Sequence, residues 1–161
     1  MKNIGKIMIN LIVLSFVLTA NTCNKEDENH HKTIGIINNS EKAIYACFDV
    51  TYPDTLGLTG VPSSSEPSIY KAEPQKSNTT ALWQDTFWEV LFRDGRLIPS
   101  DTLMVFIMDA ELLESNATHV NNTIVQRYDL SWQDLQRVNW TLTYPPSPSM
   151  SAIKMYPPFG Q

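Results

Sequence analysis

The sequence predicts a single small α+β domain in which a mixed β-sheet of about five strands packs against two helices. Residues 103–108 are apolar without alternation, which is typical of a strand covered on both faces. Residues 81–93 instead carry apolar residues at helical spacing. The expected order, strand, strand, helix, strand, strand, helix, strand, is too irregular for a doubly wound parallel sheet. A chain of 161 residues, 42% hydrophobic and 18% charged, suits one domain with one core.

The first two strands are expected at residues 33–37 and 43–51. Residues 38–42 between them have turn composition, so the two strands are predicted to form a hairpin. Residues 52–80 follow, with four prolines and three consecutive serines and no periodicity. Loops of that length are usually functional or mobile, so we expect this loop to border any binding surface.

The first helix is predicted at residues 81–93. Its apolar positions i, i+4, i+7 and i+8 fall on one face and are occupied by Trp83, Phe87, Val90 and Leu91. Trp88 and Phe92 widen this face, and Gly95 is expected to end the helix in the left-handed conformation. The pattern predicts a helix packed on a sheet, and an exposed aromatic stripe for stacking on sugars is the alternative.

Two further strands and a tail are expected in the C-terminal half. Residues 124–130 mix apolar and polar side chains, as a more exposed strand would. Residues 140–144 alternate and form the final strand. Residues 147–161 hold three more prolines and are expected to pack loosely or to extend from the domain.

A short helix is predicted between these two strands. Ser131 is its expected N-cap, and Asp134 stands where a capping box has its acid or amide. Asn139 is expected to end the helix in the left-handed conformation. The side chains on its buried side are Trp132, Leu135 and Val138.

Residues 1–22 have the features of a signal peptide. Two lysines precede an apolar run at residues 7–18, which is short for a membrane span of about 20 residues. Small and polar residues then lead to Cys23. A cysteine in this place resembles the lipobox of bacterial lipoproteins, in which cleavage leaves it as an acylated first residue. Asn21 and Thr22 depart from the small residues usual before that cysteine.

Residues 23–32 are expected to form an acidic tether, because they contain no apolar residue to bury beyond the cysteine. Lys25 followed by three acids resembles the export signal that sends Bacteroidetes lipoproteins to the outer face of the outer membrane. A spacer whose acids only keep it soluble is the alternative. Since several acyl chains anchor durably, we expect lipid anchoring in the outer membrane, with the domain at the cell surface or on the periplasmic face.

Cleavage near Ala20 without lipidation is the rival interpretation of the same signal. The chain would then be a secreted glycoprotein, since five sequons for N-glycosylation occur, at Asn38, Asn78, Asn116, Asn121 and Asn139. Asn139 argues against full occupancy because it joins a short helix directly to a strand.

Three segments carry a resemblance to a known family: IYACFDVTYPDT at residues 44–55, DTLMVFIMDA at residues 101–110 and VQRYDLSWQDLQRVNWTLTYPP at residues 125–146. They resemble a family of small, uncharacterised lipoproteins of gut Bacteroidetes. The resemblance implies export and a shared fold, and it transfers no catalytic residue. Asp-Thr followed by an aliphatic residue is also similar to the O-glycosylation acceptor of Bacteroidetes, which makes Thr55 and Thr102 possible sugar sites. An ordinary turn or strand start is the alternative at both.

The best candidates for catalysis are Asp109 and Glu111, just past the central strand, with His119 in the following loop. An acid pair with an imidazole could divide general acid and base duties in an envelope hydrolase. The simpler interpretation is a polar strand end and a solvated histidine. Cys47 lies in an apolar run, which predicts an inert core thiol.

Composition limits the remaining function classes. A formal charge of −5 without a basic run argues against nucleic acid as a partner. No cofactor is expected and no metal site either, because the adjacent histidines at residues 30–31 have no fixed geometry on a tether. We therefore expect no enzyme. The prediction is a membrane-anchored binding or structural module of the cell envelope, with a protein or a glycan as its possible partner.

Overall fold

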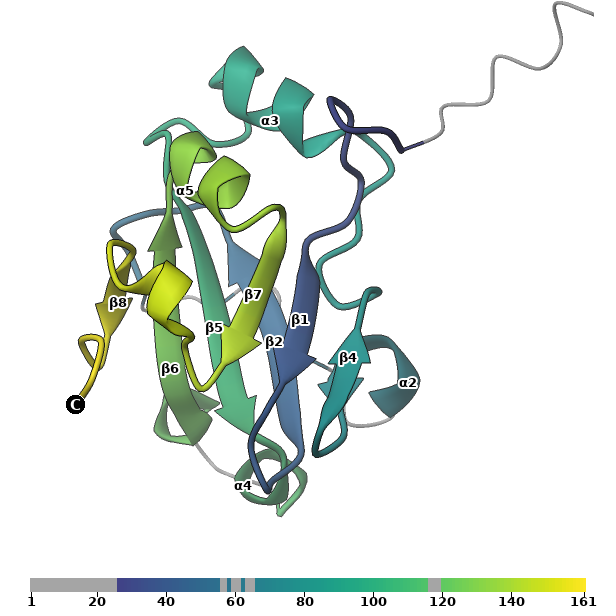
Figure 1. Ribbon diagram of the computed structural model, residues 1–161, viewed down its shortest axis with the longest axis vertical. Helices are drawn as coiled ribbons and strands as arrows, with labels where there is room; N and C mark the ends of the chain where they lie inside the picture. The colour runs from purple at the N-terminus through teal and green to yellow at the C-terminus, as the bar shows by residue number, and fades with distance from the viewer. Residues whose placement is uncertain (1–25, 56–57, 59–61, 63–65, 116–119) are drawn as a thin grey trace, which may run out of the picture.

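The computed structural model describes residues 26–55, 58, 62, 66–115 and 120–161. The strands are β1 (Gly35–Asn38), β2 (Ile44–Asp49), β3 (Lys71–Ala72), β4 (Lys76–Asn78), β5 (Leu103–Asp109), β6 (Ile124–Leu130), β7 (Thr141–Tyr144) and β8 (Lys154–Tyr156). The helices are α2 (Pro67–Tyr70), α3 (Trp88–Asp94), α4 (Ala110–Glu114) and α5 (Trp132–Arg137), with the 3-10 turns η1 (Val120–Thr123) and η2 (Pro148–Met150). Figure 1 shows α3 and α5 at one end of the strands and α4 at the other.

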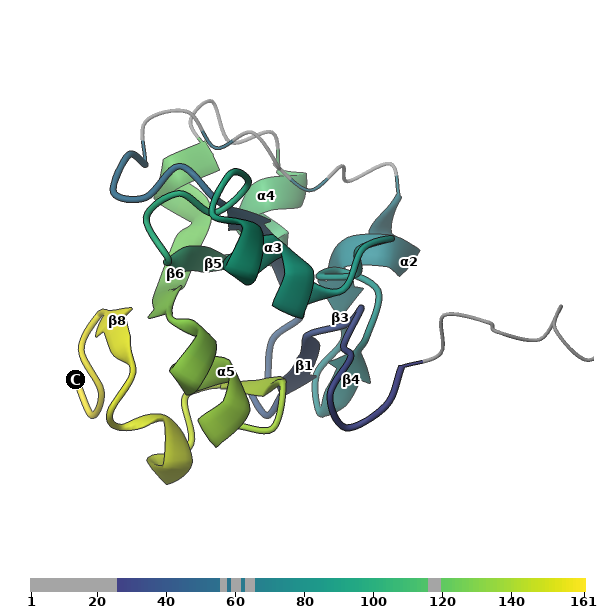
Figure 2. The same cartoon turned by 90° about the horizontal axis from the view of Figure 1, so that it is seen from above.

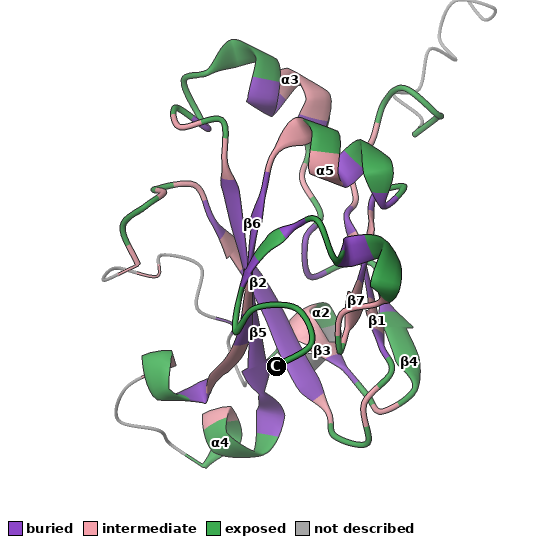
Figure 3. Cartoon of the chain, turned by 60° about the vertical axis from the view of Figure 1, so that its left-hand side comes forward, coloured by how far each residue is buried: buried purple, intermediate pink, exposed green. Residues whose placement is uncertain are grey.

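The larger sheet has the strand order β3-β2-β5-β6-β8, and each neighbouring pair is antiparallel. Strand β5 lies in the middle, and all seven of its residues are buried (Figure 3). The predicted central strand is confirmed, because an apolar run without alternation suits a strand whose two faces are both covered. Strand β6 is also present as predicted, although four of its seven residues are buried.

The smaller sheet has the order β4-β1-β7, in which β1 pairs antiparallel with β4 and parallel with β7. Apolar side chains from both sheets and from α3 and α5 form one cluster, here named the inter-sheet core. Its members include Ile36 of β1, Leu142 of β7, Val105 of β5, Leu91 of α3 and Leu135 of α5. The predicted small α+β domain is confirmed, and its strands are divided between two sheets instead of forming one.

The predicted hairpin is wrong, because β1 and β2 belong to different sheets. The chain crosses between the sheets directly after β1, and the buried Asn38 organises this crossing. Its Nδ2 donates to the carbonyls of Lys42 (2.7 Å) and Ala72 (3.0 Å). Its Oδ1 accepts from the N–H (3.0 Å) and the hydroxyl (2.7 Å) of Ser40. Turn composition predicts a reversal here, but it does not tell which strand the returning chain pairs with.

The long loop predicted at residues 52–80 contains regular structure. The segment contains α2 and the edge strands of both sheets, β3 and β4. Tyr52, Leu58 and Tyr70 also pack against a second cluster, here named the outer core, on the other face of β2 and β5. The outer core consists of Tyr45, Cys47, Met104, Phe106, Met108 and Ala110. Strands of two and three residues are too short to show periodicity, so the sequence pattern did not indicate them.

The helix predicted at residues 81–93 is correct only in its second half, because α3 begins at Trp88. Trp83 instead forms an isolated backbone bridge with Thr33, and its side chain is 49% exposed. Pairing with a distant part of the chain has replaced the local helix in this half, as tertiary context often overrides propensity. Gly95, with φ 64°, ends the helix in the left-handed conformation as predicted.

Helix α5 begins and ends as predicted. The Ser131 hydroxyl oxygen accepts from the N–H of Asp134 (3.2 Å), and the Asp134 carboxylate accepts from the N–H of Ser131 (3.0 Å), which completes the capping box. Asn139 then has φ 48°, and Trp140 has φ 56°. Two successive left-handed residues turn the chain sharply from α5 into β7.

Residues 147–161 are built into the domain, so the predicted loose tail is wrong. Strand β8 extends the larger sheet by pairing with β6. The Lys154 ammonium lies 3.5 Å from the buried carboxylate of Asp129 on β6. The buried apolar side chains of this segment are Met150, Ile153 and Met155. Burial of these three side chains holds the segment against the domain despite the surrounding prolines.

Replacing Asn38 by alanine should destabilise the fold. The variant loses the side-chain hydrogen bonds that hold the crossing between the sheets, and each buried polar group left unpaired costs about 1–3 kcal/mol. We expect the free energy of unfolding in urea to fall by roughly 3 kcal/mol. Asn39→Ala, a neighbouring exposed position, is the control and should change stability by less than about 0.5 kcal/mol. Equal losses in both variants would contradict the role given to Asn38.

Candidate functional site

The second half of the expected tether packs against helix α3. Residues 26–32, here named the N-terminal strap, lie beside α3 (Figure 1). The backbone N–H of His31 donates to both carboxylate oxygens of Glu89 on α3 (3.0 and 2.9 Å), and Nδ1 of His31 lies 2.6 Å from Oε1 of Glu89. The two side chains are only 19% and 14% exposed. The prediction of a hydrated tether is therefore wrong at His31 and Lys32, whereas residues 26–30 are exposed.

Backbone and ring contacts hold the strap as well. The carbonyl of His31 accepts from the N–H of Trp88 at the start of α3 (2.8 Å), and the carbonyl of Lys32 accepts from the N–H of Gln84 (2.8 Å). The imidazole of His31 stacks on the indole of Trp140, with 4.3 Å between the ring centroids and 12° between the planes. The strap is thus joined to α3 by hydrogen bonds and to the residue before β7 by ring stacking.

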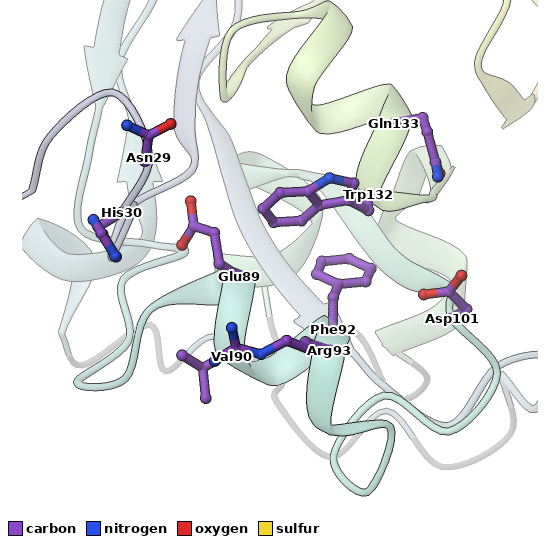
Figure 4. Close-up of a pocket in the computed structure, with 9 residues that line it drawn as sticks. All are labelled: Asn29, His30, Glu89, Val90, Phe92, Arg93, Asp101, Trp132 and Gln133. Carbon is purple, nitrogen blue, oxygen red and sulfur yellow. The ribbon is translucent and has the colours of Figure 1, made fainter.

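A groove opens between α3, α5 and the strap (Figure 4). Its volume is about 490 Å³, and it is lined by Asn29, His30, Glu89, Val90, Phe92, Arg93, Asp101, Trp132 and Gln133. An adjoining hollow of about 250 Å³ shares Asn29, Glu89 and Trp132 with it and reaches Trp140. The two hollows are together named the α3–α5 groove. Figure 2 looks down on α3 and α5 from this end of the molecule.

The apolar wall of the groove is formed by Trp132 of α5 and Phe92 of α3. Their ring centroids lie 6.1 Å apart in an edge-on arrangement, and Trp132 packs edge-on against Trp140 at 5.3 Å. These contacts fix the indole of Trp132 while leaving it only half-buried. Trp132 was expected on the buried side of its helix, and it instead also borders open space (Figure 4).

The polar wall consists of exposed side chains that the fold does not use. Four polar residues that line the larger hollow make no side-chain hydrogen bond, ion pair or ring contact within the part of the chain that the structure describes: Asn29, Arg93, Asp101 and Gln133. They come from the strap, from α3, from the turn before β5 and from α5. A ligand could therefore bond to them without first breaking an internal contact.

Sequence reasoning missed this groove for identifiable reasons. Glu89 and His31 lie 58 positions apart, and nothing in the sequence pairs them. The acids around His31 made a hydrated tether the natural prediction. One feature of the sequence did indicate a site in this region: the aromatic residues of the predicted helix suggested sugar stacking as an alternative. Of these residues, Phe92 does reach the groove, whereas Trp88 is fully buried.

The residues proposed for hydrolysis lie at the α4 end of the strands. Asp109 caps α4: its Oδ1 accepts from the N–H of Leu112 (3.1 Å), and the Lys42 ammonium donates to Oδ2 (3.3 Å). Burial raises the pKa of Asp109, but the hydrogen bonds from Leu112, Lys42 and the Glu111 N–H, together with the Lys42 charge, outweigh burial and leave its pKa below the usual value. Glu111 is exposed, and His119 lies outside the described residues. An ionised helix cap is a poor general acid at neutral pH, so the geometry favours a structural role for Asp109.

The other singled-out residues are placed as follows. Cys47 is buried in the outer core, and burial, with the nearby Asp49 charge, raises the pKa of its thiol to about 12, so this cysteine is the inert core residue predicted. Thr55 and Thr102 are both partly exposed, and the Thr102 hydroxyl donates to a neighbouring backbone carbonyl (3.2 Å). Glycosylation at both stays a prediction. Cys23 lies outside the described residues.

Comparisons with protein-family models, with curated proteins and with solved structures return no match to this chain. Across residues 26–55, 66–115 and 120–161, no group of three or more His, Cys, Asp or Glu side chains is placed to hold a metal ion. In the same part of the chain, no helix has the length and hydropathy to cross a membrane.

Proposed function

We propose that the chain is an exported lipoprotein of the outer membrane, anchored through an acylated Cys23, and that its domain is a non-enzymatic binding module. The observation that supports the binding role is the larger hollow of the α3–α5 groove, where the rings of Trp132 and Phe92 lie between polar side chains that have no partner among the described residues (Figure 4). Ligand sites typically combine an apolar surface with a few polar groups that orient the ligand. A protein or a glycan of the envelope or its surroundings is the partner.

The strap supports an anchor that keeps the groove near the membrane. Only Asn24 and Lys25 separate Cys23 from Glu26, where the strap begins. Because an extended chain spans at most about 3.6 Å per residue, the lipid and the strap are separated by no more than about 11 Å. Asn29 of the strap lines the groove, so the proposed ligand binds close to the bilayer, at the cell surface or on the periplasmic face.

Two sequons weaken the rival interpretation of a secreted N-glycosylated protein. The Nδ2 atom that would carry a glycan is occupied at Asn38 by the hydrogen bonds of the crossing between the sheets. At the buried Asn78, Nδ2 donates to the carbonyls of Ile69 (3.0 Å) and Lys71 (2.9 Å). A glycan at either position would have to displace these buried hydrogen bonds. The lipoprotein interpretation does not require this.

Replacing Cys23 by serine in the native host should remove the lipid. Cells grown with an alkyne-tagged fatty acid should incorporate the tag into wild-type protein, and the variant should lose both the tag and its sedimentation with membranes. Cys47→Ser is the matched control, because Cys47 is buried and should leave labelling unchanged. Labelling that persists in Cys23→Ser would contradict acylation at this residue.

Occupancy of the groove can be tested without knowing the ligand. A photo-crosslinking amino acid at Gln133, on the polar wall, should give a discrete adduct in living cells, seen as a mass shift of the purified protein. The same amino acid at Leu112, which is exposed on α4 at the other end of the molecule, is the control and should give none. Equal adducts at both positions, or none at Gln133, would contradict a ligand in the groove.

A further inference from the structure

The aromatic wall of the groove is suited to a ligand with flat apolar faces. Trp132 borders both hollows, and its contacts with Phe92 and Trp140 are edge-on at 65° and 75°. Neither contact is a face-to-face stack, and the half-buried indole keeps part of its surface open to the two hollows. Aromatic rings contribute a large contact area at a fixed orientation. The ring of a sugar, with C–H groups on one face, packs on such a surface.

The polar wall excludes a purely apolar ligand. Asn29 and Gln133 each offer a donor and an acceptor, Asp101 only accepts, and Arg93 only donates. Covering these groups with an acyl chain or an apolar peptide face would remove water from them without replacing its hydrogen bonds, which is unfavourable. Hydroxyl groups both donate and accept, so a polyhydroxylated ligand can satisfy all four side chains.

The charges of the groove and of the whole chain bear on whether the ligand is ionic. The larger hollow is lined by Arg93 and by the acids Glu89 and Asp101, and the smaller hollow is also lined by Glu28. Glu89 is occupied by His31 of the strap. The whole chain carries a formal charge of −5, which disfavours the approach of a polyanion. The excess of acids over Arg93 in the lining likewise disfavours an anionic ligand.

On these grounds we infer that the α3–α5 groove binds an uncharged oligosaccharide. One of its sugar rings lies on Trp132, and hydroxyls along the oligosaccharide bond to Asn29, Arg93, Asp101 and Gln133. The inference rests on the proposed binding function and names its ligand class. The two joined hollows, of about 490 and 250 Å³, favour a chain of more than one ring. The saccharide is either the headgroup of a membrane glycolipid or a free oligosaccharide, since both present the same chemistry.

The test uses the mature protein on three arrays: uncharged oligosaccharides of hexoses and N-acetylhexosamines, acidic oligosaccharides with uronic acids, and peptides. We expect binding to members of the first array, and titration calorimetry then gives the Kd of the best one. Trp132→Ala should weaken this Kd by about tenfold or more, because it removes the aromatic platform. Trp83→Ala, an equally large exposed indole outside the groove, is the matched control and should leave the Kd unchanged.

A second variant is needed because Trp132 also packs against the inter-sheet core, so Trp132→Ala could lose binding by destabilising the fold. Gln133 is exposed and its side chain makes no hydrogen bond within the described chain, so Gln133→Ala should keep the thermal midpoint of unfolding and weaken the Kd several-fold. Comparing a glycolipid in vesicles with its free headgroup distinguishes the two sources. Tighter binding to either one is compatible with the inference.

Three results would overturn the inference: no binding on the uncharged array, preference for acidic saccharides or peptides, or a Kd that neither Trp132→Ala nor Gln133→Ala changes. Peptide binding that requires Trp132, together with an adduct at Gln133 in cells, would overturn only the ligand class and leave the binding function standing. Absence of the adduct at Gln133 would count against the binding function itself.

Discussion

Strand β5 is buried on both faces, and most of the fold serves to cover it. An apolar strand of seven residues in the middle of a sheet needs a cover on each side, and the two covers have different origins. The smaller sheet and helices α3 and α5 supply one side through the inter-sheet core. On the other side, Tyr52, Leu58 and Tyr70 from the segment between β2 and β4 pack on the outer core. This demand explains why Tyr52, Leu58 and Tyr70 are part of the packed structure.

The groove follows from how the inter-sheet core is closed at one end. Helices α3 and α5 have seven and six residues, lengths at which an isolated helix is not stable, so tertiary contacts must hold them. Trp88, Leu91 and Leu135 anchor their inner sides in the core. The strap bonds to the start of α3 through His31, and Trp132 spans the space between the helices. The contacts that close the core thus also form the walls of the candidate site.

The sequence predicted those features that depend on neighbouring residues. The covered strand β5, the capping box of Ser131 and the left-handed Gly95 and Asn139 all follow from local spacing or local backbone chemistry. Features that depend on distant partners were predicted wrongly or not at all: the partner of β1, the start of α3 set by pairing with Thr33, the addition of β8, and the bond between His31 and Glu89. The candidate site consists mostly of the second kind. Only its aromatic residues could be predicted from the sequence. The packing of the strap could not, because the acids around His31 are typical of a hydrated tether.

The acidic N-terminal strap is a fixed wall of the candidate site. Hydrogen exchange of the backbone amides, followed by NMR on the mature protein, tests this directly at three positions: His31, Gln84 and Trp88. The N–H of His31 donates to Glu89, and those of Gln84 and Trp88 donate to strap carbonyls. We predict exchange at all three that is far slower than in an unstructured peptide and comparable with the amides of β1. Exchange of His31 at the unstructured rate, with β1 still protected, would contradict the claim.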